Sequence, residues 1–362
     1  MTPIKIAVIS YRLPVEGKKR GGIERVAHVL ADGLARRGHT VVVFSHDPRP
    51  AAAAYEVREL PWKSFVETWA GLRMTAGYLG NLLALQVDLR EFDVVVAHGD
   101  SLLLLLGRTP VVRVMHGSAR GEALHATSIG RAILQWGVYS QELLTAFLSP
   151  SSVVGVSTNT QRDNRFVRRV IPNGIDTAIF QPLPIAKSPH PSIVFVGAVD
   201  GRKRGRFLLD MFERVVRPAY PKAELTFVGP KGPPQPGVTY VTGVPDKDLA
   251  TLYRRAWVCA APSTYEGFGL PYLEAMACGT AVIATPNPGS REVLGEDYPG
   301  LVEDAAFAPA LVNLLADQGS RHLLEITGTH RAAGFSIDRM IDQYETLLSD
   351  LRGSHARSIA SA

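Results

Sequence analysis

The chain has 362 residues, which is too many for one ordinary domain and suits two domains of about 150 residues or more each. Hydrophobic residues make up 46% and charged residues 20%, as in a globular protein, and two cysteines, Cys259 and Cys278, are too few for a disulfide framework or a four-cysteine zinc site. The formal net charge of +5 indicates an anionic partner but does not choose among nucleic acid, an acidic membrane and a phosphorylated small molecule.

The amino-terminal segment MTPIKIAVIS carries Lys5 inside a short apolar run, so it does not fit a secretory signal peptide. No apolar run approaches the roughly 20 residues of a membrane-spanning helix, and the run at 102–106 is far too short. We therefore expect a cytoplasmic protein whose two thiols are reduced and buried.

Short runs rich in valine and isoleucine alternate with segments of helical length along most of the chain. Nearly continuous runs of this kind are typical of parallel strands that are buried on both faces. The predicted fold class is therefore α/β, with doubly wound parallel sheets. The predicted strands lie in residues 4–10, 40–45, 93–99, 110–117, 153–157, 192–199, 224–229, 257–263 and 280–286.

A proline-rich polar stretch, FQPLPIAKSPHPS at 180–192, interrupts this pattern, and the pattern restarts after it. We expect an amino-terminal domain over 1–181 and a carboxyl-terminal domain over 190–335. Two such sheets facing each other would form a cleft, and open parallel sheets bind ligands beyond the carboxyl ends of their strands.

The last predicted helix, residues 336–352, carries one apolar stripe and needs a surface to pack on. The stripe consists of Ile337, Met340, Ile341, Tyr344, Leu347 and Leu348.

The stretch YEGFGLPYLEAMACGT carries two glutamates, Glu266 and Glu274, around a glycine-rich turn. Glu266 follows a predicted strand, and Pro271 and Gly279 suit the start and the end of a short helix over 270–278. The free N–H groups of that helix and of the glycine loop would bind a phosphate. Glu274 would then accept hydrogen bonds from ribose hydroxyls, and Glu266 from a group farther along the ligand. The alternative is that Glu274 only stabilises the helix dipole and that Glu266 is solvated.

In this segment the sequence resembles glycosyltransferase family 4. Members of that family carry a Glu-x7-Glu signature, have the GT-B fold and transfer sugar from nucleotide sugars with retention at the anomeric carbon. The resemblance extends over most of the chain. It also implies the surface on which the last helix packs, because in this family that helix crosses back onto the amino-terminal domain. The other matching segments are GGIERVAHVLADGLARRGHTVVVFS, HGSARG, VIPNGIDTAIF and FSIDRMIDQYETLLSDL.

The resemblance implies site residues position by position. Glu274 would hold the ribose and Glu266 the donor sugar, while His116, in VMHGS after a strand, would lie near the donor sugar and the acceptor; a structural histidine is the alternative. Backbone N–H groups at sugar and phosphate would come from Gly267, Phe268, Gly269 and Leu270, and Gly21 and Gly22 would approach the diphosphate from the other domain.

The basic loop departs from the family pattern. The strand at 192–199 is followed by DGRKRGRF, so that Ala198 stands at the usual arginine position and Arg204 at the usual lysine position. Arg202 or Lys203 can supply the missing charge, and which of the three basic side chains holds the diphosphate stays open. A nucleic-acid role is not favoured for this loop, because it connects a strand to a helix and is not a free arm.

The resemblance implies glycosyl transfer to a hydroxyl of a small-molecule, glycan or lipid-linked acceptor. No Asp-x-Asp metal signature stands in a suitable context, so we expect metal-independent activity and no cofactor besides the nucleotide sugar as co-substrate. Base readout is expected from main-chain groups near Gly243 and Val244, which leaves UDP-sugar and GDP-mannose both open as donors.

Three further hypotheses remain from the sequence. A sugar-nucleotide epimerase or a phosphorylase could use the same two-domain plan, and a non-catalytic nucleotide- or nucleic-acid-binding protein is favoured by the charge alone. Residues 62–86 combine aromatic, apolar and basic side chains, as in a helix at a membrane surface; core packing or an acceptor pocket is the alternative.

Overall fold

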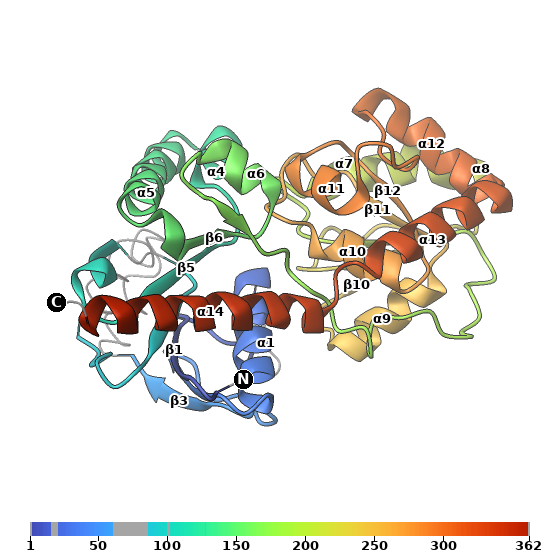
Figure 1. The fold of residues 1–362 in the computed structure, drawn as a ribbon. Helices are drawn as coiled ribbons and strands as arrows, with labels where there is room; N and C mark the ends of the chain where they lie inside the picture. The colour runs from blue at the N-terminus through green and yellow to red at the C-terminus, as the bar shows by residue number, and fades with distance from the viewer. Residues whose placement is uncertain (1, 16–20, 61–85, 100–101, 127, 361–362) are drawn as a thin grey trace. The chain divides into compact units, whose positions relative to one another are not determined.

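The computed structural model describes residues 2–15, 21–60, 86–99, 102–126 and 128–360, with side chains as far as His355. The chain divides into two compact units (Figure 1). Unit 1 comprises Met1–Asn173 and Ile337–Ala362, and unit 2 comprises Gly174–Ser336. The element labels below are those of Figure 1.

Unit 1 is built on a seven-stranded parallel sheet in the order β3-β2-β1-β4-β5-β6-β7. Its central strands are buried along their length, as their valine-rich sequences require. The short outer strands β3 and β7 carry exposed charged residues, as edge strands commonly do. The strands are β1 Lys5–Ile9, β2 Thr40–Ser45, β3 Glu56–Glu59, β4 Val94–Ala97, β5 Val111–Met115, β6 Val153–Gly155 and β7 Arg169–Val170.

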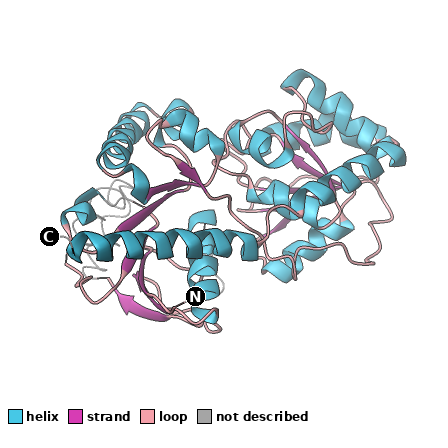
Figure 2. Cartoon of the chain, in the orientation of Figure 1, coloured by secondary structure: helices cyan, strands magenta, loops and turns pink. Residues whose placement is uncertain are grey.

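Helices flank the strands of unit 1 (Figure 2). The last helix, α14, packs against α1, where Gly33 allows close approach: a Cβ at Gly33 would lie 2.1 Å from Cδ1 of Ile341. Arg37 pairs with Asp342 at 2.5 Å and with Glu345 at 2.6 Å across the same contact. The helices are α1 Gly22–Arg36, η2 Leu102–Leu106, α4 Ala119–Leu124, α5 Ile129–Leu148, η3 Pro150–Ser152, α6 Thr158–Asp163 and α14 Ile337–Ala360.

Unit 2 contains a five-stranded parallel sheet in the order β10-β9-β8-β11-β12. The strands are β8 Ser192–Val196, β9 Glu224–Val228, β10 Val238–Val241, β11 Val258–Ala261 and β12 Ala281–Ala284. The helices are α7 Gly205–Met211, the π-helical turn η4 Phe212–Val216, α8 Arg217–Ala219, α9 Asp246–Arg255, α10 Leu270–Ala277, α11 Pro288–Leu294, α12 Asp304–Ala316 and α13 Gln318–Ala332.

The predicted α/β class with parallel sheets is confirmed, and each predicted strand corresponds to one of these strands. The short helix with Glu274 ends where expected, because Gly279 follows it in a left-handed conformation with φ of 71°. The division between the units falls after Asn173, earlier than the expected end at 181, so the proline-rich stretch 180–192 lies inside unit 2. Five residues of the apolar stripe on α14 are buried, and Ile337 is half-buried.

Candidate functional site

The sheet of unit 2 reverses its winding between β8 and β11. From β8 the chain proceeds to β9 on one side, and it returns through α9 to β11 on the other side. The loops that follow β8 and β11 therefore border a topological switch point, the place where open parallel sheets bind ligands. These loops carry the basic stretch 201–206 and the glutamate stretch.

The two loops meet through charged side chains at Glu266. Arg202 donates from Nη1 to the carboxylate of Glu266 at 2.8 Å, and Lys203 pairs with the other carboxylate oxygen. Ser263 adds a hydrogen bond of 3.0 Å from its hydroxyl. Burial alone would raise the pKa of Glu266, but Lys203 and Arg202 outweigh it and lower the pKa below the usual range. Glu266 is therefore an ionised, 95% buried anchor for two cations, since only 5% of it is exposed.

Arg204, the third basic candidate, points elsewhere. Its guanidinium pairs with Asp304 at 2.7 Å and lies over the ring of Phe207, 4.2 Å from the centroid. Its backbone is left-handed, with φ of 55°, at the position just before α7. The structure thus brings Arg202 and Lys203 together with Glu266 and separates Arg204 from them.

The glycine loop leads directly into α10 without a side-chain cap. Gly269 has φ of 104°, and a Cβ there would lie 2.6 Å from the ring of Tyr272, so only glycine fits. Pro271 occupies the first turn of the helix. No capping side chain therefore accepts hydrogen bonds from the N–H groups at the start of α10, and an anion site at a helix start uses N–H groups of this kind.

Glu274 lies in α10 and is only 2% exposed. The hydroxyl of Tyr253, on α9, donates to its carboxylate at 3.1 Å. Burial raises the pKa of Tyr253 well above its usual value, and Glu274 adds to this shift, so the phenol stays neutral and donates. The ribose role of Glu274 stays a prediction, and Tyr253, which the sequence did not single out, is its partner here.

In unit 1, two histidines meet at the carboxyl ends of neighbouring strands. His98 follows β4 and His116 follows β5, and Nδ1 of His98 lies 2.8 Å from Nε2 of His116. The ring planes differ by 26°, which suits an in-plane hydrogen bond. Burial lowers the pKa of His116 to about 4, and burial together with His116 lowers that of His98. The pair is therefore neutral at pH 7.

His98 was assigned no role from the sequence, although its segment VVVAHG repeats the strand-then-His-Gly pattern of VMHG. Gly21 and Gly22 begin α1, again without a side-chain cap. Glu24 lies beside them: a Cβ at Gly21 would be 2.8 Å from its Oε2, which is buried and lacks a hydrogen-bond partner in the described part of the chain.

Gly243 follows β10 in a left-handed conformation with φ of 64°, and Val244 leads into α9. Both are at the carboxyl edge of the unit 2 sheet, beside β9. Their predicted role in base readout stays a prediction.

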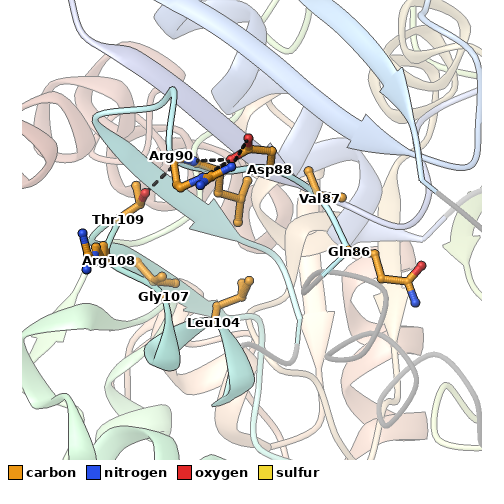
Figure 3. A pocket seen from close by; sticks show the side chains of 10 residues that line it. Gln86, Val87, Asp88, Arg90, Leu104, Gly107, Arg108 and Thr109 are labelled. Carbon is orange, nitrogen blue, oxygen red and sulfur yellow. Dashed lines mark hydrogen bonds and ion pairs between the residues drawn. The ribbon is translucent and has the colours of Figure 1, made fainter.

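A pocket of about 390 Å³ lies in unit 1, where Leu104, Arg108 and the ion pair of Asp88 and Arg90 line it (Figure 3). It opens at the amino ends of β4 and β5, since residues 86–90 precede β4 and Val111 begins β5. This is the opposite sheet edge from the histidines, so the pocket is not the candidate site.

Among the described residues there is no group of three or more His, Cys, Asp or Glu side chains placed to hold a metal ion. The helices of the described ranges include none long and apolar enough to cross a membrane. Residues 62–85 of the predicted membrane-surface segment lie outside the described residues.

Comparison with known proteins gives two family matches that together span most of the chain. Residues 20–179 match Glycosyltransferase Family 4, and residues 190–317 match Glycosyl transferases group 1. O-antigen chain mannosyltransferase B of Escherichia coli is 31% identical over 41% of this chain, but the match spans only 43% of that relative. MMP alpha-(1->4)-mannosyltransferase of Mycolicibacterium hassiacum is 27% identical, over 89% of this chain and 94% of that protein.

Among solved structures, Anabaena Alr3699/HepE in complex with UDP and glucose has a TM-score of 0.68 and 17% identity, over 96% of this chain and 100% of that one. This likeness concerns the fold, which is of the GT-B type. The group 1 match spans both the basic loop and the Glu-x7-Glu segment. The chain belongs to glycosyltransferase family 4 and is a glycosyltransferase.

Proposed function

We propose that the protein binds a nucleoside diphosphate sugar at the switch point of unit 2 and transfers its sugar, with retention, to an acceptor hydroxyl. The observation that supports this most is the convergence of Arg202 and Lys203 on Glu266 beside the uncapped start of α10. Two cations face one carboxylate, so one positive charge is left over for a diphosphate.

The cations and the helix end suit the leaving group. Negative charge grows on the diphosphate as the bond to the anomeric carbon breaks, and Lys203, Arg202 and the N–H groups of α10 would stabilise it. Glu266 holds both cations in place and can accept a hydrogen bond from a sugar hydroxyl. Retention would follow from attack on the face that the phosphate leaves, with the leaving oxygen taking the acceptor's proton.

His116 would contribute a hydrogen bond and not a charge. Because both histidines are neutral at pH 7, one N–H lies between them, donated by either Nδ1 of His98 or Nε2 of His116. If Nδ1 of His98 donates, both rings carry their hydrogen on Nδ1. If Nε2 of His116 donates, both rings carry it on Nε2. In either case Nε2 of His116 is hydrogen-bonded to His98, so Nδ1 of His116 is the ring nitrogen left to contact a sugar or an acceptor.

The donor and acceptor are tested by product analysis. Two relatives are named mannosyltransferases and one similar structure holds UDP and glucose, so GDP-mannose and UDP-glucose are the first donors to compare. Glycan and lipid-linked hydroxyls are the acceptors to test beside small molecules. We expect a product with the donor's α configuration, read from the anomeric NMR coupling, and unchanged activity after EDTA treatment.

An epimerase or a phosphorylase would give another outcome. An epimerase would convert the nucleotide sugar without an acceptor, and a phosphorylase would release a sugar phosphate when inorganic phosphate is added. Either product, with no acceptor-linked sugar, would contradict the transfer reaction.

A cytoplasmic location with peripheral membrane contact completes the proposal. Cys259 and Cys278 are free and buried, which agrees with a reducing compartment. Membrane contact is tested by sedimentation with vesicles, where binding to anionic lipid should fall as salt rises.

A further inference from the structure

Helix α5 turns polar groups inward. Glu142 is buried and accepts a hydrogen bond of 3.1 Å from the backbone N–H of Ala119, at the start of α4. The buried guanidinium of Arg113, on β5, lies 4.0 Å from the same carboxylate and donates to Thr145 at 3.1 Å. These contacts fix the rotation of the helix about its axis.

The opposite face of α5 is apolar and exposed. Residues at spacings of three and four form one stripe along the helix, in which Ser140 is the polar member. Ile129 is 82% exposed, Ile133 68% and Phe147 60%. Trp136 and Leu144 continue the stripe between them, and Leu148 borders it. A 20-residue helix is about 30 Å long, so this surface exceeds the scattered apolar residues of an ordinary protein surface.

Arginines adjoin the carboxyl-terminal end of the stripe. Phe147 packs edge-on against Phe166 at 5.3 Å between ring centroids, and Arg165 lies 5.1 Å over the same ring. Exposed arginines surround Phe166 in the sequence, at positions 162, 165, 168 and 169. The acidic residue among them, Asp163, is paired with Arg120 at 2.7 Å. The exposed charge beside the stripe is therefore positive.

We propose that α5 is the surface by which the protein lies on an anionic lipid bilayer. The apolar stripe would enter the boundary between headgroups and acyl chains, and the arginines would contact lipid phosphates. Trp136, paired edge-on with Tyr139, provides the aromatic group that favours this boundary. A second copy of the chain is the competing occupant: a parallel contact between two α5 helices would bring the same arginines together and an antiparallel one would not, so light scattering is included in the test.

This inference deepens the membrane contact proposed above, and it is independent of the transfer reaction. It names a surface other than residues 62–86. The helix would lie in the plane of the membrane, because its inward face is tied to α4 and β5.

The test is sedimentation of the full chain with vesicles of phosphatidylcholine, with and without phosphatidylglycerol. We expect binding to the mixed vesicles at low salt, and a loss of about tenfold or more in Ile133→Asp/Phe147→Asp. The matched control is Leu323→Asp/Ile326→Asp on α13, whose side chains are 56% and 57% exposed; it should bind as the wild type does. Thermal unfolding and the nucleotide-induced shift verify that each variant is folded.

A charge variant separates the two contributions. Arg165→Glu should weaken binding to the mixed vesicles and leave binding to phosphatidylcholine alone unchanged. If the α5 double variant binds like the wild type, or if light scattering shows a wild-type dimer that this variant dissociates while vesicles bind neither protein, the proposal is wrong. Because nucleotide binding is measured separately, such a result leaves the proposed transferase function untouched.

Discussion

The carboxyl edges of the two sheets differ in charge although both are built from parallel strands and the loops after them. At the edge of unit 2, two cations meet one carboxylate, and the uncapped start of α10 adds further positive character. At the edge of unit 1, His98 and His116 form a neutral pair. The proposed function therefore assigns the diphosphate to unit 2, whereas unit 1 offers uncharged hydrogen-bonding groups.

The two edges differ in charge because the side chains at each edge have different partners. Arg202 and Lys203 are partly exposed, with side chains 37% and 19% accessible, and both pair with the buried carboxylate of Glu266. No carboxylate pairs with either histidine in the described part of unit 1, so burial, together with the neighbouring ring in the case of His98, lowers their pKa values. Substitutions at each edge should therefore affect different steps.

The largest effect is expected for Glu274→Ala. If Glu274 holds the ribose as predicted, the loss of its buried carboxylate removes both hydrogen bonds to the ribose, and we expect nucleoside diphosphate affinity to fall about 100-fold, measured by calorimetry. Tyr253→Phe is the matched control, because it removes the hydrogen bond to Glu274 and keeps the carboxylate. It should lower affinity less than about tenfold. Unchanged affinity in Glu274→Ala would refute the ribose role.

The second largest effect on nucleoside diphosphate affinity should distinguish Lys203 from Arg204. Lys203→Ala should weaken nucleoside diphosphate binding about 10- to 30-fold, since the proposed charge-assisted contact of this partly buried side chain would be lost. Arg204→Ala should stay within about twofold, because Arg204 pairs with Asp304. The reverse order in calorimetry would move the phosphate contact to Arg204, as the family pattern alone suggests.

Gly269→Ala tests the loop before α10. The added Cβ would meet Tyr272 at 2.6 Å in a backbone with φ of 104°, so the free energy of unfolding should fall by about 1–3 kcal/mol in urea. Gly243→Ala is the control, because its φ is 64° but nothing lies within 4 Å of the new atom. An equal loss in both variants would show that backbone conformation alone, and not the contact with Tyr272, sets the cost.

The smallest effect concerns the neutral histidines. The usual histidine pKa of 6.5 falls to about 4 in folded His116, so between these values the unfolded chain binds a proton that the folded chain does not. The free energy of unfolding should therefore decrease as pH is lowered through this window, and less so in His116→Asn.

Nitrogen-15 NMR of labelled histidines checks the pairing directly. At pH 7, His98 and His116 should be neutral and carry hydrogen on the same-named nitrogen. His98→Asp should raise the pKa of His116, because a carboxylate favours the imidazolium. An imidazolium at either position in the wild type would be inconsistent with the neutral pair.

The sequence predicted the buried parts of the fold well, because continuous valine runs such as VVVA of β4 are typical of central parallel strands. It did not predict the outer strands β3, β7 and β10; the sequences EVRE of β3 and RV of β7 carry charges suited to an edge. The sequence puts the end of the first domain at 181, because prolines mark a break in the pattern there, whereas contacts group residues 174–181 with unit 2.

For the site, the sequence identified the residue types but not their pairing. Arg202 and Glu266 are 64 positions apart, and their contact depends on β8 lying next to β11 in the sheet. The order of strands is not encoded in either loop. The bond between His98 and His116 likewise follows from the pairing of β4 with β5. Nothing in the local sequence of α5 indicated that its apolar face would be the exposed one.

The most direct test of the central claim is a thermal-shift series with UDP, GDP, ADP and dTDP, on the wild type and on Lys203→Ala. A ligand at a hundred times its dissociation constant adds about 2.7 kcal/mol of stability. We predict a clear rise in the wild-type melting temperature with one of these nucleotides, and a much smaller rise in the variant. If none of the four raises the wild-type melting temperature, the nucleoside diphosphate site in unit 2 is contradicted.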